Sequence, residues 1–135
     1  MRKLGLLALL GCAHAARGPP GFGLSKEQAA EVCLPPGEKA FLGALFCEDG
    51  TRPHLTRIGN IGTRTQPLDP NDPRLLLEMD AEVPIPKGAA DLHIIEAVDA
   101  VCGGQKYTLY IDMYHCPPMG EPPPPLPPPP EHFKY

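Results

Sequence analysis

The cysteines constrain this chain more than any other feature. Cys12 lies close to the N-terminus, and four more follow at Cys33, Cys47, Cys102 and Cys116. Thirteen residues separate Cys33 from Cys47, and thirteen separate Cys102 from Cys116. Zinc fingers and ribbons instead place paired cysteines about two to four residues apart. We therefore expect two disulfides among the last four cysteines, in a small domain whose modest core needs covalent support.

The first fifteen residues have the composition of an export signal. The basic pair Arg2 and Lys3 precedes an apolar run from Leu4 to Leu10, which is the order found in a secretory signal peptide. Ala13 and Ala15 form an Ala-x-Ala site. This site predicts cleavage by a signal peptidase after the second alanine.

A second processing route stays open at the same place. Leu9-Leu10-Gly11-Cys12 resembles the lipobox of bacterial lipoproteins, and this resemblance implies that Cys12 carries a lipid and becomes the mature N-terminus. Either route removes or occupies the odd cysteine and leaves an even number for disulfides. The expected location is the periplasm or, as a lipoprotein, the cell envelope, with secretion as the alternative. Contact with a membrane is expected only through a lipid anchor.

The chain divides into four parts by composition. Residues 1–15 form the leader, 16–24 a flexible spacer, 25–117 one globular domain, and 118–135 a disordered polyproline tail. The charges of the whole chain sum to −4, and no basic cluster occurs among them. Phosphate binding needs concentrated positive charge, so nucleic acid is not an expected partner.

The globular part is expected to be an α+β domain, with a short N-terminal helix on a four-stranded antiparallel sheet made of two hairpins. Ser25 and Gln28 match a capping box. They predict a helix over 26–32 that ends before the two prolines that follow. The apolar run 40–47, closed by Glu-Asp-Gly, predicts a strand with 54–61 as its hairpin partner.

The second hairpin is the strongest local signal in the sequence. Residues 92–101 and 106–115 are rich in β-branched and aromatic residues, and they flank Gly103-Gly104. We expect a three-residue loop, because that register places one mostly apolar stripe of each strand on the same face. Between the hairpins, 73–79 is expected to form one or two helical turns.

This hairpin limits the disulfide pairing. Cys102 lies at its turn and Cys116 at its open end, about ten residues or 30 Å away, whereas a disulfide needs Cα atoms within about 7 Å. The pair Cys102–Cys116 is therefore excluded, and Cys33–Cys47 with it. Each of Cys33 and Cys47 is expected to pair with Cys102 or Cys116, and the sequence does not choose between the two arrangements.

Two histidines and a carboxylate are the candidate metal ligands. His93 and His115 fall on the same face of the hairpin, and Asp91 lies close to His93 in the sequence. Imidazole and carboxylate suit zinc, whose catalytic sites use three protein ligands and an open position. The competing interpretation is that each histidine ends an apolar stripe and bonds to the backbone.

The expected function is an exported, envelope-anchored binding or structural module, without catalytic residues or a cofactor. No G-x-S-x-G, H-E-x-x-H or S-x-x-K motif occurs, and the one serine, Ser25, lies in the expected helix cap. The alternative is a small metal-binding or hydrolytic enzyme centred on His93 and His115. Pro122–Pro130 predicts a polyproline rod. Such a rod serves either as a spacer or as a ligand for the aromatic groove of a protein partner.

The lipobox resemblance generates a first test. Replacing Cys12 with alanine is expected to release the protein from bacterial membranes and to leave the fold unchanged, because only the acyl anchor is lost. Membrane fractionation of wild type and Cys12→Ala measures this. Wild-type protein that is already soluble and begins at Ala16 would contradict lipidation and support cleavage after Ala15.

Overall fold

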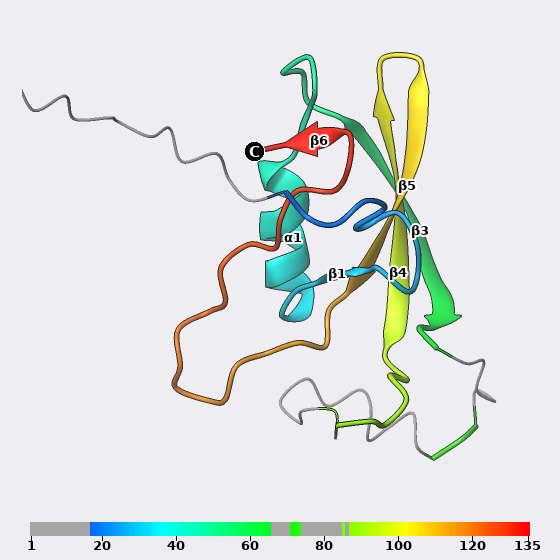
Figure 1. The fold of residues 1–135 in the computed structure, drawn as a ribbon, viewed down its shortest axis with the longest axis vertical. Coiled ribbons are helices and arrows are strands. Elements are labelled where there is room, and N and C mark those ends of the chain that lie inside the picture. Colours follow the sequence, from blue (N-terminus) through cyan, green and yellow to red (C-terminus); the bar gives the residue numbers. More distant parts are fainter. Residues whose placement is uncertain (1–16, 66–70, 74–84, 86) are drawn as a thin grey trace, which may run out of the picture.

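The structure is a small α+β domain in which one helix lies against a twisted sheet (Figure 1). It is a computed structural model, and it describes residues 17–65, 71–73, 85 and 87–135. The leader with Cys12 and nearly all of the expected helical turns at 73–79 lie outside the described residues. The elements in chain order are β1 (Ala30–Glu31), α1 (Leu34–Ala44), β2 (Phe46–Cys47), β3 (His54–Thr63), β4 (Ile94–Cys102), β5 (Gln105–Asp112) and β6 (Phe133–Lys134).

The main sheet has the order β1-β5-β4-β3. Its three long strands are antiparallel neighbours, whereas β1 runs parallel to β5. The sheet is therefore mixed, and the expectation of four antiparallel strands is wrong. The strand expected over 54–61 is present as β3, but it pairs with β4 and not with 40–47. The first of the two expected hairpins does not exist.

The second hairpin is confirmed, although its turn is tighter than expected. Cys102 pairs with Gln105, so the loop is the two glycines 103 and 104 alone. Glu96 lies opposite Ile111, and Val98 lies opposite Leu109. This register turns Val98 and Leu109 into the core. The three-residue loop, which would have grouped the side chains differently, is wrong because the diglycine turn closes by itself.

The helix lies where a strand was expected. Pro35 and Pro36 lie in the first turn of α1, where backbone N–H groups have no partner within the helix and the missing N–H of proline is not needed. Glu38 and Phe41, three residues apart, are both buried. Such spacing places them on one helix face toward the sheet. The proline pair that was expected to end a helix thus starts one, and the apolar run after it is helical because short apolar runs fit either structure.

The N-terminal helix expected over 26–32 is not formed. Ser25 Oγ accepts a hydrogen bond from Gln28 N at 3.2 Å, but it closes only a turn. Ala30 and Val32 are buried while Glu31 between them is exposed. This alternation is that of a strand, and β1 adds the segment to the edge of β5.

The core lies between α1 and the facing side of the sheet. It also receives side chains from both ends of the described chain. Its buried members are Ala30, Val32, Phe41, Leu45, Val98, Ala100, Leu109, Ile111, Met113 and Phe133.

Both segments that were expected to lie outside the domain pack on it. In the expected spacer, Phe22 and Leu24 lie against the core, and Gly23 O accepts a hydrogen bond from Tyr110 N at 2.9 Å. In the expected tail, Phe133 is only 5% exposed, and β6 pairs antiparallel to β2. We call residues 117–132, between Cys116 and β6, the proline strap. Because its far end is anchored in the core, the expectation of a disordered tail is wrong.

Two disulfides hold these parts together. Cys33 is bonded to Cys116, and Cys47 is bonded to Cys102, which is one of the two arrangements that the sequence left open. The first joins the start of α1 to the chain after β5, and the second joins β2 to the hairpin turn. In the part of the chain that the structure describes, no helix is long and apolar enough to cross a membrane.

The anchored strap generates a stability test. Phe133→Ala is expected to lower the free energy of unfolding by about 3–5 kcal/mol, the usual cost of emptying a buried aromatic site. The matched control is Met119→Ala in the strap that leads to Phe133. The Met119 side chain is 85% exposed, and the expected change is within about 0.5 kcal/mol. Urea unfolding measures both. Equal stability of the two variants would show that the strap does not belong to the folded domain.

Candidate metal centre

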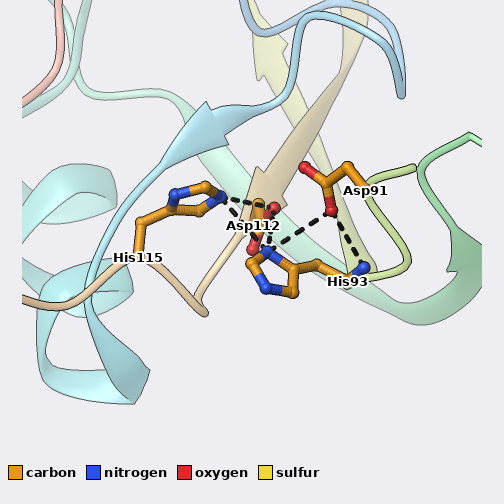
Figure 2. A group of neighbouring side chains, drawn as sticks. All are labelled: Asp91, His93, Asp112 and His115. Atoms are coloured by element: carbon orange, nitrogen blue, oxygen red, sulfur yellow. Dashed lines mark hydrogen bonds and ion pairs between the residues drawn. The ribbon is translucent and has the colours of Figure 1, made fainter. Parts of the chain in front are cut away.

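Four side chains with nitrogen or oxygen ligands meet at the open end of the β4–β5 hairpin (Figure 2). Asp91 and His93 lie just before β4, Asp112 ends β5, and His115 follows three residues later. Because Ile95 pairs with Asp112, the chain before β4 and the chain after β5 leave the sheet at the same place. The antiparallel register therefore brings the four residues together.

The cluster is mostly shielded from water. His93 is 2% exposed and Asp112 is fully buried, while Asp91 and His115 are partly buried. One ligand atom from each of the four lies within 4.8 Å of the others. Burying polar groups in this way is costly unless each finds a partner.

The shortest distances converge on one carboxylate oxygen. Asp112 Oδ2 lies 3.0 Å from His93 Nδ1 and 2.9 Å from His115 Nε2. These two ring nitrogens are themselves 3.2 Å apart. Asp91 Oδ1 lies 3.4 Å from His93 Nδ1. The first three atoms form a nearly equilateral triangle, and the fourth lies beside one corner.

The Asp112 carboxyl group is ionised. Burial alone would raise its pKa, but hydrogen bonds from His115, His93 and the Tyr114 backbone N–H, together with the charge of His115, outweigh burial and hold the pKa well below its usual range. The oxygen at the centre of the cluster is therefore an acceptor without a hydrogen of its own.

Hydrogen bonds cannot satisfy all three edges of this triangle. An imidazole nitrogen carries either a hydrogen or a lone pair. If both nitrogens carry hydrogens, both can donate to Asp112, but two N–H groups then crowd each other at 3.2 Å. If either nitrogen carries a lone pair, it faces the carboxylate as a second acceptor. One edge is repulsive in each case, and a cation that accepts a lone pair from all three atoms would remove the repulsion.

The ligand side chains are held in place from outside. His93 N donates to Asp91 Oδ1 at 2.9 Å, and Tyr114 N donates to Asp112 Oδ1 at 3.0 Å. The second ring nitrogen of His115, Nδ1, lies 3.4 Å from Glu31 Oε2. Histidine ligands of metals commonly donate their other N–H to a carboxylate, and Glu31 lies in that position.

Arg64, just after β3, is the fixed cation of the centre. Its three guanidinium nitrogens lie 3.1 Å from Asp112 Oδ2, 3.2 Å from Asp91 Oδ2 and 3.0 Å from Glu31 Oε1. Three carboxylates and one guanidinium sum to −3 + 1 = −2 when both imidazoles are neutral. The cluster thus carries two negative charges, in a place where Asp112 and Asp91 are shielded from water and Glu31 is half exposed.

This excess of negative charge affects the pKa of His115. Burial would lower its pKa, but the hydrogen bond and the charge of Asp112, with the charge of Glu31, outweigh burial and raise the pKa. Arg64 opposes the increase. A proton on His115 therefore cancels part of the negative charge in the absence of another cation.

The structure brings together His93, His115 and Asp91, the three residues that the sequence marked as candidate ligands. Asp112 was not among these candidate ligands. The diglycine would have identified Asp112 if it had been taken as a two-residue turn. That turn sets the register in which Asp112 pairs with Ile95 at the open end of the hairpin. Arg64 and Glu31 were also missed, because they reach the cluster through pairings of β3 and β1 that the sequence did not predict.

Comparison with known proteins adds no relative to this description. No family model, no curated protein and no solved structure matches the chain. The function must therefore be inferred from the geometry itself.

The shifted pKa values predict how stability depends on pH without metal. The pKa of Asp112 is lowered, so its stabilisation is present above the ordinary value of 3.8 and is lost as the pH falls. The pKa of His115 is raised, so its stabilisation is complete below the ordinary value of 6.5 and is lost as the pH rises through the raised value. Urea unfolding in a chelator is expected to show highest stability between these limits.

The matched variant for this test is Asp112→Asn, which removes the partner on which both effects depend. This variant is expected to flatten the pH dependence of stability at both the acidic limit and the limit above 6.5. Should the variant not fold, NMR titration of the His115 ring in wild type gives the same information, with a midpoint expected above 6.5. Stability that rises steadily from pH 5 to pH 9, or a midpoint at or below 6.5, would contradict the coupling.

Proposed function

We propose that this protein is an exported, disulfide-stapled module that binds one divalent transition-metal ion, with zinc as the reference ion, through Asp91, His93, Asp112 and His115. The observation that carries the proposal is the triangle of Asp112 Oδ2, His93 Nδ1 and His115 Nε2, whose edges are 2.9–3.2 Å. A cation is the one occupant that makes all three contacts favourable.

The distances fit the size of zinc. Ligand atoms about 2.0–2.1 Å from a tetrahedral zinc ion are about 3.3 Å from each other. Four of the six distances among the ligand atoms, 2.9, 3.0, 3.2 and 3.4 Å, need only small adjustments to reach that value, and the two that join Asp91 to Asp112 and His115 are at most 4.8 Å. Two imidazoles and two carboxylates also form a ligand set that suits zinc.

The charge fits a divalent ion. The carboxylates and Arg64 leave −2 when the imidazoles are neutral, and a divalent cation brings the sum to zero. The ion would replace the proton of His115, since metal ligands must be deprotonated. Zinc binding is therefore expected to weaken as the pH falls.

A binding role is better supported than a catalytic one. Four protein ligands complete a tetrahedron, as in structural sites, whereas catalytic zinc keeps one position for water. Asp91 decides between them, because the distance from its Oδ1 to His93 Nδ1, 3.4 Å, is longer than the three edges of the triangle. A hydrolytic site would be favoured only if Asp91 did not bind the metal.

The exported part of the proposal depends on the leader together with the disulfides. Two disulfides are consistent with an oxidising compartment, and they leave Cys33, Cys47, Cys102 and Cys116 without thiols that would bind zinc. The periplasmic, lipoprotein and secreted locations remain alternatives within this proposal.

Zinc titration of the purified, oxidised protein tests the function. Calorimetry is expected to give one site, with zinc stabilising the fold by about 2.7 kcal/mol when free zinc exceeds the dissociation constant a hundredfold. His115→Gln is expected to weaken binding at least about a hundredfold, since even outer partners of ligands commonly contribute about ten- to a hundredfold. The matched control is His54→Gln on exposed β3, which is expected to bind as wild type does.

The outcomes separate the alternatives. Absence of zinc binding by wild type, or equal binding by wild type and His115→Gln, would overturn the metal site. Weakened binding in Asp91→Asn supports the closed set of four ligands. Unchanged binding in Asp91→Asn would instead indicate three ligands and an open position, and would favour the hydrolytic alternative. Circular dichroism establishes that each variant is folded.

A further inference from the structure

A cleft of about 410 Å³ lies between the start of α1 and the proline strap. One wall is Val32, just before α1, with Pro36 and Ala40, which share a face of α1 because they are four residues apart. The other wall is Pro123–Pro127 of the strap. This volume is within the range of about 300–1,000 Å³ that is typical of small-molecule sites, and such sites are also mostly apolar.

Both walls are fixed before any ligand arrives. Cys33 lines the cleft and is bonded to Cys116, the residue before the strap. The strap then leaves the sheet and returns alongside α1 (Figure 1), where Phe133 is buried in the core. Proline has few backbone conformations to lose. Ligand binding would therefore cost little conformational entropy, because the walls of the cleft are already ordered.

One charged side chain lines the cleft, and it is acidic. Glu31 has a side chain that is 49% exposed. One of its oxygens bonds to Arg64, and the other lies 3.4 Å from His115 Nδ1. A carboxylate has about four acceptor positions, so these contacts leave room for a further donor. Among the described residues no lysine, arginine or histidine lines the cleft, and the nearby Arg64 guanidinium is already bonded to Glu31.

We propose that this cleft binds a small amphiphilic amine: an apolar body between the helix and the strap, with one ammonium group at Glu31. The apolar walls select the body, and the acidic residue at the edge selects the charge. This inference goes beyond the metal centre and does not depend on it, since the cleft is present without a metal ion.

Three matched probes test the charge selection: 4-phenylbutylamine, the neutral 4-phenylbutanol and the anionic 4-phenylbutyrate. Each is titrated into the oxidised protein by NMR, with a chelator present so that the result is independent of metal binding. The amine is expected to bind about tenfold more tightly than the alcohol, because a hydrogen bond to a charged group contributes about that factor. The anion is expected to bind more weakly than the alcohol.

Two variants locate the site. Ala40→Trp fills the cleft from an exposed helix position and is expected to abolish binding of all three probes. Lys39→Trp, the neighbouring exposed helix position outside the cleft, is the control and is expected to bind as wild type does. Glu31→Gln is expected to keep binding of the alcohol and to remove the preference for the amine.

The proposal is overturned by any of three results. These are no binding of the amine at millimolar concentration, equal binding of amine and anion, or equal binding by Ala40→Trp and Lys39→Trp. Zinc binding measured separately on the same protein distinguishes a failure of this inference from a failure of the metal site.

Discussion

The Cys33–Cys116 disulfide is the constraint on which most of this structure depends. It joins residues 83 positions apart, so it ties the start of α1 to the chain that leaves β5. His115 is the residue before the bond, and the proline strap begins directly after it. The cluster and the cleft therefore lie on either side of one covalent link. In a domain of this size, hydrophobic burial alone would hold the start of α1 and the chain after β5 together less firmly.

The buried charge of Asp112 is the second constraint. An ionised carboxylate that is fully buried destabilises a protein unless its oxygens are bonded and its charge is balanced. Arg64, His93, His115 and the Tyr114 N–H supply the bonds. They supply too little positive charge, because Asp91 and Glu31 join the same network. A proton on His115 makes up part of the difference, and the proposed metal ion would compete with this proton. The metal-free protein and the proposed metal-bound protein would then depend on pH in opposite ways above about 6.5.

Local patterns predicted the parts of the fold that local contacts determine. The β4–β5 hairpin needs only its own two strands and its diglycine turn, and the proximity of His93 to His115 follows from it. Contacts between residues far apart in the sequence decided the rest of the fold. The apolar run at 40–47 fits a strand or a helix until Phe41 and Glu38 meet the sheet. The strap was expected to lie outside the core because of its many prolines, yet the one buried aromatic ring of Phe133, just after the strap, is enough to anchor it. Arg64 follows β3 and Glu31 lies in β1, and no local sequence pattern predicts the strands with which β3 and β1 pair.

Glu31 connects the two proposed sites, and this has a thermodynamic consequence. Zinc on Nε2 of His115 would strengthen the contact of Nδ1 with Glu31, 3.4 Å away, because a carboxylate partner commonly supports a metal-bound histidine. An ammonium group in the cleft would draw on the same carboxylate. Each ligand would then find Glu31 already engaged by the other, so each would lower the affinity of the other by the same factor, because binding couplings are reciprocal. A protein of this size would thus link a metal ion and an organic cation through one carboxylate at the edge of β1.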